Sequence, residues 1–472
     1  MGLNDDIPAA ADSAVAQSNG PSQTPIRQTL GLIDVVTIIV GIVIGSGIFK
    51  LPGLVANSCP NETVFLLVWL AGGVMSLIGA LCYAELASTY PNAGGDYYFI
   101  HRAFGRGMSF LFAWCRMTVI QTGSIAFLGF FIGDYLSALY PLGPYSPAVY
   151  AAVTIVGLTA INLLGIRQGK WAQILFTAAI VTGLLLVVGL GFAGTPAEAA
   201  TEPHQPPMGL GMAMVFVLLA FGGWNESAYV SAEIKHPGRN IVRSLLIGLA
   251  CVTVVYLLVN LAYLRVLGLH GMAESRNVAQ DLVKASLGER FVPVITFGVV
   301  FAVLSSANAT IISGARSNYA LGRDFKVFGW LGVWNSRNST PVAALIVQGL
   351  ISLVLVLLGT AIDVETGFET MVAYTTPVFW FFFFLVGVSV FVLRRKDPGR
   401  RRVFSVPFYP LTPFLFCLIG LYMLKNGFDY ILLLPKIGLY SGVGAAIGIA
   451  VLLLGIPFYL VDRWLTRSGR AG

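Results

Sequence analysis

The chain has 472 residues, of which 56% are hydrophobic and only 11% are charged. Soluble globular proteins carry about 25% charged residues, so this chain has too few polar groups to cover a soluble surface. Its net charge of +7 does not indicate a nucleic-acid-binding protein, because the basic residues lie between long apolar runs and form no basic face. The composition predicts a polytopic protein embedded in a lipid bilayer.

The chain begins with a polar segment, residues 1–28, which we expect to be a disordered cytoplasmic tail because it is rich in Ala, Ser, Pro and Gln. Twelve apolar runs follow, each of a length suited to a membrane-spanning helix. They cover residues 30–55, 64–89, 109–140, 147–164, 171–193, 209–233, 245–267, 291–321, 342–359, 371–393, 408–424 and 437–461.

The connections between these runs are alternately rich and poor in Lys and Arg. Twenty-one of the 29 basic residues fall on one side of the predicted membrane and seven on the other. Because basic loops stay in the cytoplasm, the pattern predicts that both termini are cytoplasmic. It also supports twelve spans, since a missed helix would exchange the two sides downstream. We expect a multi-pass protein of the plasma membrane, or of the inner membrane of a bacterium.

Two of the apolar runs are interrupted near their middle, the first at residues 45–49 and the sixth at residues 221–226. If the chain consists of two halves of five spans, these are the first spans of the two halves. An odd number of spans per half gives the halves opposite orientations, which is an inverted repeat. Glycine-interrupted spans at matching positions indicate the binding site of a transporter.

The physical reason is that unwinding a helix within a bilayer leaves backbone N–H and C=O groups unpaired, which costs several kcal/mol for each group. A half-helix N-terminus can bind a carboxylate, and the carbonyls that end the preceding half can bind an ammonium group. A zwitterionic amino acid fits both. The alternative is that Gly41, Gly45 and the following glycines form only a close helix-packing face. That alternative does not explain Asn225 and Glu226 in mid-span, or the matching positions of the breaks.

At these positions the sequence resembles the amino acid–polyamine–organocation superfamily of permeases, and in particular the light chains of the L-type amino acid transporters. The resemblance is strongest over the first eight spans and beyond them is mainly one of hydropathy. The matching residues are 44–49 (Ile-Gly-Ser-Gly-Ile-Phe), 82–86 (Cys-Tyr-Ala-Glu-Leu), Pro91 with 94–97 (Gly-Gly-Asp-Tyr), Arg116, 222–225 (Gly-Gly-Trp-Asn), Glu233, Pro237, Arg239 and Asn240.

The resemblance implies an all-α membrane protein with the LeuT-like fold, in which helices 1 and 6 are broken and two helices follow the two five-helix repeats. Residues 29–194 would form the first repeat and residues 208–396 the inverted second repeat. Residues 407–463 would form helices 11 and 12, followed by a cytoplasmic tail, 464–472. Such proteins move amino acids by alternating access.

The resemblance also implies a binding site at the two breaks. Gly45 lies in the first break, where the N–H groups of Ser46 and Gly47 would bind the substrate carboxylate. Backbone carbonyls at the two breaks would accept hydrogen bonds from the substrate amino group, and Asn225 would lie near the substrate side chain or the helix-six turn. The carbonyls concerned are those of Val43, Leu219 and Gly222.

The sequence departs from the family pattern at several positions. A lysine that many relatives have in the fifth span aligns here with Ile180, so sodium coupling through Thr310 and Ser313, or uncoupled transport, is left open. The loop 140–147 has no cysteine, so no disulfide-linked heavy chain is expected.

Ionisable residues within the membrane are costly and usually functional. Arg116 has three interpretations: a structural ion pair, a gate, or a side chain that reaches the headgroups. Glu226 is the first candidate for a protonatable or cation-selecting group, and capping of the second half-helix is an equal alternative. Glu85 and Glu233, near cytoplasmic ends, are predicted partners in ion pairs of an interior gate.

An integral-membrane enzyme is the competing class. Metal or haem chemistry would need histidines within the spans, and all four histidines lie outside them. We therefore predict no enzyme, no metal and no cofactor. The predicted function is transport of neutral amino acids, by exchange or by symport with H⁺ or Na⁺. The alternatives are a cationic amino acid or polyamine transporter, or an amino acid receptor that does not transport.

Overall fold

The computed structural model describes residues 31–92, 94–164, 169–194, 209–235, 237–335, 340–433 and 442–468. Within these ranges the regular elements are helical, and Asn335 and Thr340 form an isolated antiparallel bridge. The predicted all-α class is confirmed. The predicted tail 1–28 and residues 469–472 of the predicted tail 464–472 lie outside the described residues, as do His204 and His236. Residues 464–468 continue helix α16, so the last span extends further than predicted.

Up to the second break, the chain forms one broken span, four further long helical stretches, a short connecting helix and the first part of the second broken span. Its elements are α1 (Leu32–Val43), η1 (Ser46–Phe49), α2 (Leu51–Ala56), α3 (Glu62–Thr89), α4 (Gly95–Phe104), α5 (Arg106–Cys115), η2 (Arg116–Ile120), α6 (Gln121–Ser137), α7 (Ser146–Leu164), α8 (Gly169–Ala193) and α9 (Leu210–Ala220). The remaining elements are η3 (Trp224–Glu233), α10 (Pro237–Glu274), α11 (Val278–Leu287), η4 (Glu289–Phe291), α12 (Val292–Asp324), η5 (Lys326–Gly332), α13 (Val342–Ile362), α14 (Gly367–Lys396), α15 (Leu411–Leu433) and α16 (Gly442–Ser468).

Ten helical stretches in the described part of the chain are long and apolar enough to cross a bilayer. Two shorter apolar helices, Leu32–Gly41 and Ile180–Ala193, lie in the first and fifth predicted spans. The first is short because it ends at a break. The multi-pass architecture is therefore established, while the full count of twelve spans stays a prediction.

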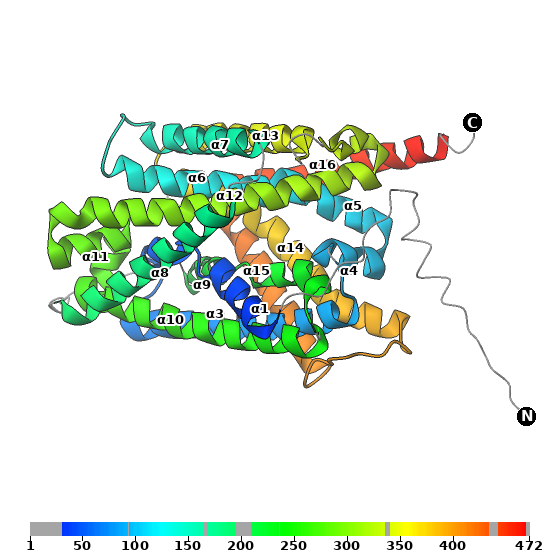
Figure 1. The fold of residues 1–472 in the computed structure, drawn as a ribbon, viewed down its shortest axis with the longest axis horizontal. Helices are drawn as coiled ribbons and strands as arrows, with labels where there is room; N and C mark the ends of the chain where they lie inside the picture. Colours follow the sequence, from blue (N-terminus) through cyan, green and yellow to red (C-terminus); the bar gives the residue numbers. More distant parts are fainter. Residues whose placement is uncertain are drawn as a thin grey trace, which may run out of the picture.

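The helices gather into two groups (Figure 1). In one, α6 packs against α7, α12 and α13; in the other, α10 packs against α1, α2 and α3. Each group combines helices from both halves of the chain. Segment η1 contacts α12 of the first group. The first break therefore lies where the two groups meet.

Small residues allow close packing within the first group. Gly129 and Gly133 lie one turn apart on α6, and both face α7. A Cβ on Gly129 would lie 3.3 Å from the Cα of Ala151, and one on Gly133 would lie 2.2 Å from the carbonyl oxygen of Pro147. This is the small-residue spacing that lets helix backbones approach in membranes.

Candidate functional site

The two breaks occur at the predicted positions. Helix α1 ends at Val43, Gly45 is extended, and a 3₁₀ turn begins at Ser46. Helix α9 ends at Ala220, and a turn leads to the 3₁₀ segment that begins at Trp224. Gly223 in that turn has a φ of 102°, a left-handed conformation that favours glycine. Both helices therefore stop because the backbone changes direction there.

The two breaks lie next to each other. A Cβ placed on Gly47 would be 3.5 Å from the Cα of Ala220, which is van der Waals contact between the two segments. The hydroxyl of Tyr256 on α10 connects the two breaks: it lies 2.7 Å from the carbonyl oxygen of Val43 and 3.0 Å from that of Ala220. The tyrosine ring packs against Trp69. Broken helix ends from the two halves thus share one buried donor.

The predicted carbonyl ligands have different surroundings. The Val43 carbonyl accepts from the N–H of Gly45 at 2.7 Å as well as from Tyr256. The Leu219 carbonyl accepts from the N–H of Gly222 at 3.1 Å. The side chain of Ser46 lies outside the described residues. The predicted roles of these groups in binding a substrate stay predictions.

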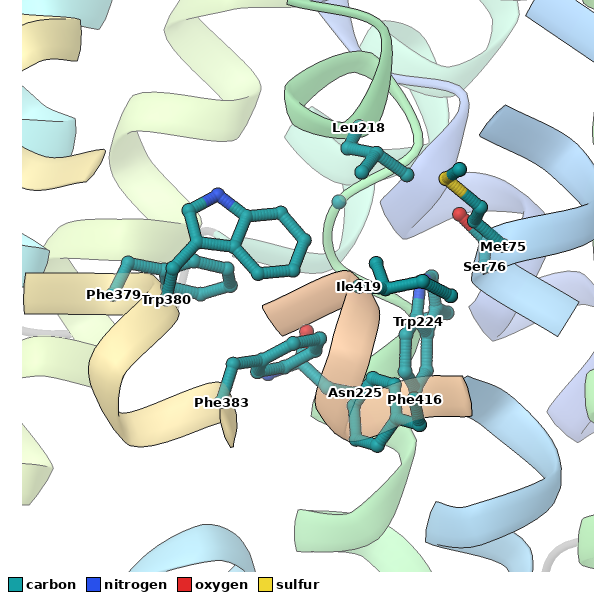
Figure 2. A pocket seen from close by; sticks show the side chains of 11 residues that line it. Met75, Ser76, Leu218, Trp224, Asn225, Phe379, Trp380, Phe383, Phe416 and Ile419 are labelled. Atoms are coloured by element: carbon teal, nitrogen blue, oxygen red, sulfur yellow. The ribbon is translucent and has the colours of Figure 1, made fainter. Parts of the chain in front are cut away.

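A small pocket, with a cavity volume of about 20 Å³, lies beside the break in the sixth span. Five aromatic side chains line it, and Figure 2 shows them facing a common space from η3, α14 and α15. Gly222, Asn225 and Ser76 are its small and polar members, and the described lining includes no charged residue. The aromatic residues are Trp224, Phe379, Trp380, Phe383 and Phe416. The predicted residues Gly222 and Asn225 therefore lie at an apolar, aromatic pocket.

Arg116 is buried, with 6% of its surface exposed, and it begins a π-helical turn in the third span. Its Nε donates to the hydroxyl of Ser317 at 3.0 Å, and one terminal nitrogen lies 3.6 Å from Oε1 of Glu226. Of the three interpretations of Arg116 that the sequence leaves open, the geometry favours an ion pair. Arg116 thus joins the third span, α12 and the unwound part of the sixth span.

The residues predicted for a sodium site have other partners. The hydroxyl of Ser313 lies 3.4 Å from a guanidinium nitrogen of Arg116, and the hydroxyl of Thr310 donates to the carbonyl of Ser306 at 2.8 Å. A cation at Ser313 would be repelled by the guanidinium. Ile180, aligned with the missing lysine, is buried.

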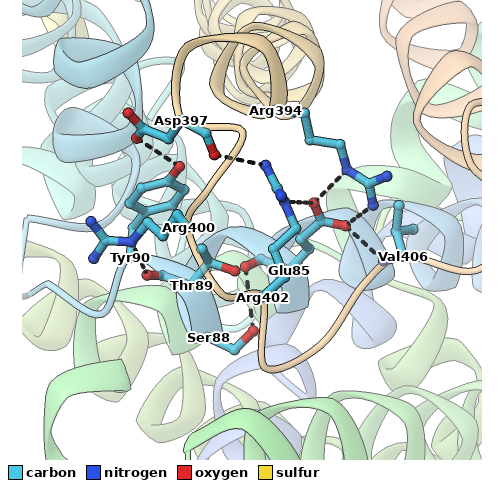
Figure 3. A network of polar contacts seen from close by, with 9 residues as sticks. All are labelled: Glu85, Ser88, Thr89, Tyr90, Arg394, Asp397, Arg400, Arg402 and Val406. Atoms are coloured by element: carbon cyan, nitrogen blue, oxygen red, sulfur yellow. Dashed lines mark hydrogen bonds and ion pairs between the residues drawn. The ribbon is translucent and has the colours of Figure 1, made fainter. Parts of the chain in front are cut away.

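Glu85 forms the centre of a polar network at the predicted cytoplasmic ends of α3 and α14 (Figure 3). Its carboxylate accepts two bonds from Arg394, at 2.8 and 2.5 Å, and one from the N–H of Val406 at 2.7 Å. Arg402 lies 3.6 Å away. The ion pairing predicted for Glu85 agrees with this geometry, and its gating role stays a prediction. The side chain of Glu233 lies outside the described residues.

A second ion pair, between Lys50 and Asp134, lies near the C-terminal end of α6, which is the end of the third span farther from Arg116 in sequence. The ammonium group lies 4.9 Å from the centre of the Phe368 ring. Sequence reasoning missed both this pair and Tyr256. The available signals were a lysine directly after the first break and a tyrosine in the middle of an apolar run, neither of which identifies its partner.

Comparison with known families gives a match to the family model described as "Amino acid permease" over residues 30–454. Among curated proteins, the b(0,+)-type amino acid transporter 1 of Oryctolagus cuniculus is 30% identical over 409 residues, covering 82% of this chain and 81% of that protein. The Mus musculus protein of the same name is 29% identical, covering 88% of this chain and 85% of its own length.

A second group of relatives has a different name. The large neutral amino acids transporter small subunit 2 of Mus musculus is 28% identical over 466 residues, covering 94% of this chain and 82% of that protein. The similarity therefore spans both halves of the chain and both breaks, and it includes the spans beyond the eighth, where the motifs of the sequence are weakest.

Proposed function

Because the chain belongs to the amino acid permease family, with relatives among the L-type transporter light chains, we propose that it carries neutral amino acids across the cell membrane by alternating access. Amino acid transport itself follows from the family. The substrate class, the mode of transport and the site residues are our proposals. In this proposal, residues 29–194 and 208–396 are the two inverted repeats.

The observation that carries the proposal is that the two breaks lie side by side. The hydroxyl of Tyr256 lies within hydrogen-bonding distance of a carbonyl from each break, those of Val43 and Ala220. Irregular backbone at membrane depth is tolerated where it lines a cavity or is buried in protein. The backbone groups of Gly45, Ser46 and Gly47 would bind the carboxylate, and the carbonyls around the breaks would bind the amino group.

The pocket beside Asn225 supports a neutral substrate. Its aromatic lining would accept an apolar side chain, and no described charge faces it. A cationic side chain would need a free carboxylate, and Glu226 already lies 3.6 Å from Arg116. Transport of cationic amino acids or polyamines is therefore the second candidate.

The surroundings of Ser313 support exchange or proton-coupled transport over sodium symport, because a guanidinium lies 3.4 Å from its hydroxyl. We also propose that both termini are cytoplasmic and that no disulfide links the chain to a heavy chain, since the loop 140–147 has no cysteine.

The test is uptake into proteoliposomes that contain the purified protein. Radiolabelled leucine should accumulate when the vesicles are loaded with unlabelled leucine, and labelled arginine should accumulate much less. Replacing external Na⁺ with K⁺ should leave uptake unchanged. Binding without accumulation would identify a receptor, and faster uptake of arginine than of leucine would favour the second candidate.

A further inference from the structure

Asp96 is a buried carboxyl group close to the unwound part of the sixth span. It lies in the first turn of α4, the short helix between the second and third spans, and only 5% of its surface is exposed. Its Oδ1 has no hydrogen-bond partner among the described residues. Helix α4 packs against α5, α14 and η3. A buried carboxyl oxygen without a donor is costly when ionised.

The charged groups that act most strongly on Asp96 are Arg116, which is attractive, and Glu226, which is repulsive; Tyr83 and Asn225 also face it. Arg116 and Glu226 are themselves 3.6 Å apart. The cluster therefore contains two carboxyl groups and one guanidinium. When both acids are ionised, the cluster carries one excess negative charge away from bulk water, and a single proton removes it.

Four basic side chains on α4, α5 and α14, and His101 on α4, have contacts elsewhere. Arg102 pairs with Asp397, Arg106 with Asp462, and Arg394 with Glu85. Lys396 donates to the carbonyl of Ala103, and His101 lies 3.0 Å from the hydroxyl of Ser109. The described surroundings of Asp96 thus leave Arg116 as the principal cation that stabilises its ionised form.

Burial raises the pKa of Asp96 to about 7, since the loss of hydration outweighs the attraction of Arg116, and the charge of Glu226 raises it further. The N-terminus of α4 favours the ionised form by only about half a pH unit. The carboxyl group therefore changes its charge near neutral pH.

We propose that Asp96 is a proton-binding group of this transporter, and that its protonation sets how tightly Arg116 holds Glu226 and, with it, the unwound segment of the sixth span. The inference rests on the proposed transport function. With Asp96 neutral, Arg116 interacts with Glu226 alone and the cluster is uncharged. With Asp96 ionised, the two carboxylates compete for one guanidinium, so the arrangement around the sixth-span break is less stable. Substrate exchange should then be faster when Asp96 is protonated.

The first experiment measures thermal stability of the purified protein at different pH values. A carboxyl group whose pKa is raised by folding binds more protons in the folded state, so it lowers stability as pH rises from about 4 through 7. Asp96→Asn resembles the protonated form. The variant should melt about 2–4 °C above the wild type at pH 8 and close to it at pH 4. Asp429→Asn, which removes an exposed carboxylate, should show no such pH-dependent difference.

A melting difference that is the same at both pH values, or an Asp96→Asn variant that is less stable at pH 8, would overturn the proposal. If that variant does not fold, Glu226→Gln provides the same information. Because the charge of Glu226 raises the pKa of Asp96, its removal should move the stability transition to lower pH without abolishing it. An unmoved transition would contradict the proposed cluster.

The second experiment measures exchange of leucine in proteoliposomes with equal pH on both sides. Wild-type exchange should fall as pH rises through about 7, and Asp96→Asn should give a flat profile. Glu226→Gln should keep a transition at lower pH. Wild-type exchange that is independent of pH would overturn the proton role while leaving transport intact. If no amino acid is exchanged, the transport function fails, and the melting experiment still decides the role of Asp96.

Discussion

At the residue scale, Tyr256 has the most direct connection to the proposed substrate site. Its ring is buried against Trp69 and Phe221, and its hydroxyl lies between two carbonyls that end helices. Because the hydroxyl carries one hydrogen, it donates to one of the carbonyls at a time. The same carbonyl of Val43 is proposed to bind the substrate amino group, so the tyrosine and the substrate would share an acceptor.

We expect Tyr256→Phe to keep the ring packing and to leave the carbonyls of Val43 and Ala220 without this donor. Losing a donor to buried acceptors costs about 1–3 kcal/mol. The free energy of unfolding should therefore fall by about that amount, and the KM for leucine exchange should change severalfold. Both are measurable, by denaturation in micelles and by uptake into proteoliposomes.

The control lies on the same helix. Tyr263 is also fully buried, but its hydroxyl has no hydrogen-bond partner among the described residues. Tyr263→Phe should therefore be neutral or stabilising and should leave KM unchanged. Equal effects of the two substitutions would show that the hydroxyl of Tyr256 has no special role at the breaks.

At the element scale, α6 and α7 show how glycine spacing positions the helices of the first group. Lipid tails are as apolar as the helices, so association within a bilayer depends on close packing more than on the hydrophobic effect. A Cβ on Gly133 would meet only backbone atoms of Pro147, and backbone atoms cannot move aside as a flexible side chain can. This contact fixes the third span, which also contains Arg116 and Asp134.

Gly133→Ala should lower the stability of the protein by about 1–3 kcal/mol, the usual cost of overpacking a well-packed contact. Within a helix, alanine is intrinsically more stable than glycine by about 1 kcal/mol. A loss of stability in Gly133→Ala would therefore show that the close contact outweighs this gain. Gly157→Ala on α7 is the matched control, because nothing lies within 4 Å of a Cβ there. That control should be neutral or more stable in the same melting assay, and a stabilising Gly133→Ala would contradict the close approach.

At the scale of the whole molecule, ion pairs connect segments far apart in sequence at both ends of the helices. Glu85 and Arg394 are 309 residues apart and join α3 to α14, while Lys50 and Asp134 join the first break to α6. The side chain of Glu85 is 4% exposed and that of Arg394 is 19% exposed. Removing one partner leaves a poorly hydrated charge, which is why such pairs are sensitive to single substitutions.

We expect Glu85→Gln to lower the free energy of unfolding by about 2–3 kcal/mol, less than the ~3–5 kcal/mol of a fully buried pair. A double-mutant cycle with Arg394→Gln should give a coupling of about 1–3 kcal/mol. Asp429→Asn, which breaks an exposed pair with Lys425, should change stability by less than about 1 kcal/mol. Additive effects of Glu85→Gln and Arg394→Gln would contradict a direct interaction.

Several features of the protein could be predicted from its sequence because they depend on local composition. The thickness of a bilayer sets the length of an apolar run, so hydropathy locates the spans. Backbone groups must be satisfied within lipid, so the glycine-rich interruptions at 45–49 and 221–226 are recognisable as breaks from the sequence alone. The motif around each break then indicated the family.

The partners of the polar residues were decided by tertiary structure alone. Tyr256, Lys50 and Asp96 have no neighbours in sequence that reveal what they contact, because their partners come from other helices. Helix packing brings Asp96, Arg116 and Glu226 together from three separate elements, and burial then determines which of their charges is costly. The sequence by itself determined where the chain crosses the membrane and where it breaks, whereas the packing of the helices decided which buried charges face one another.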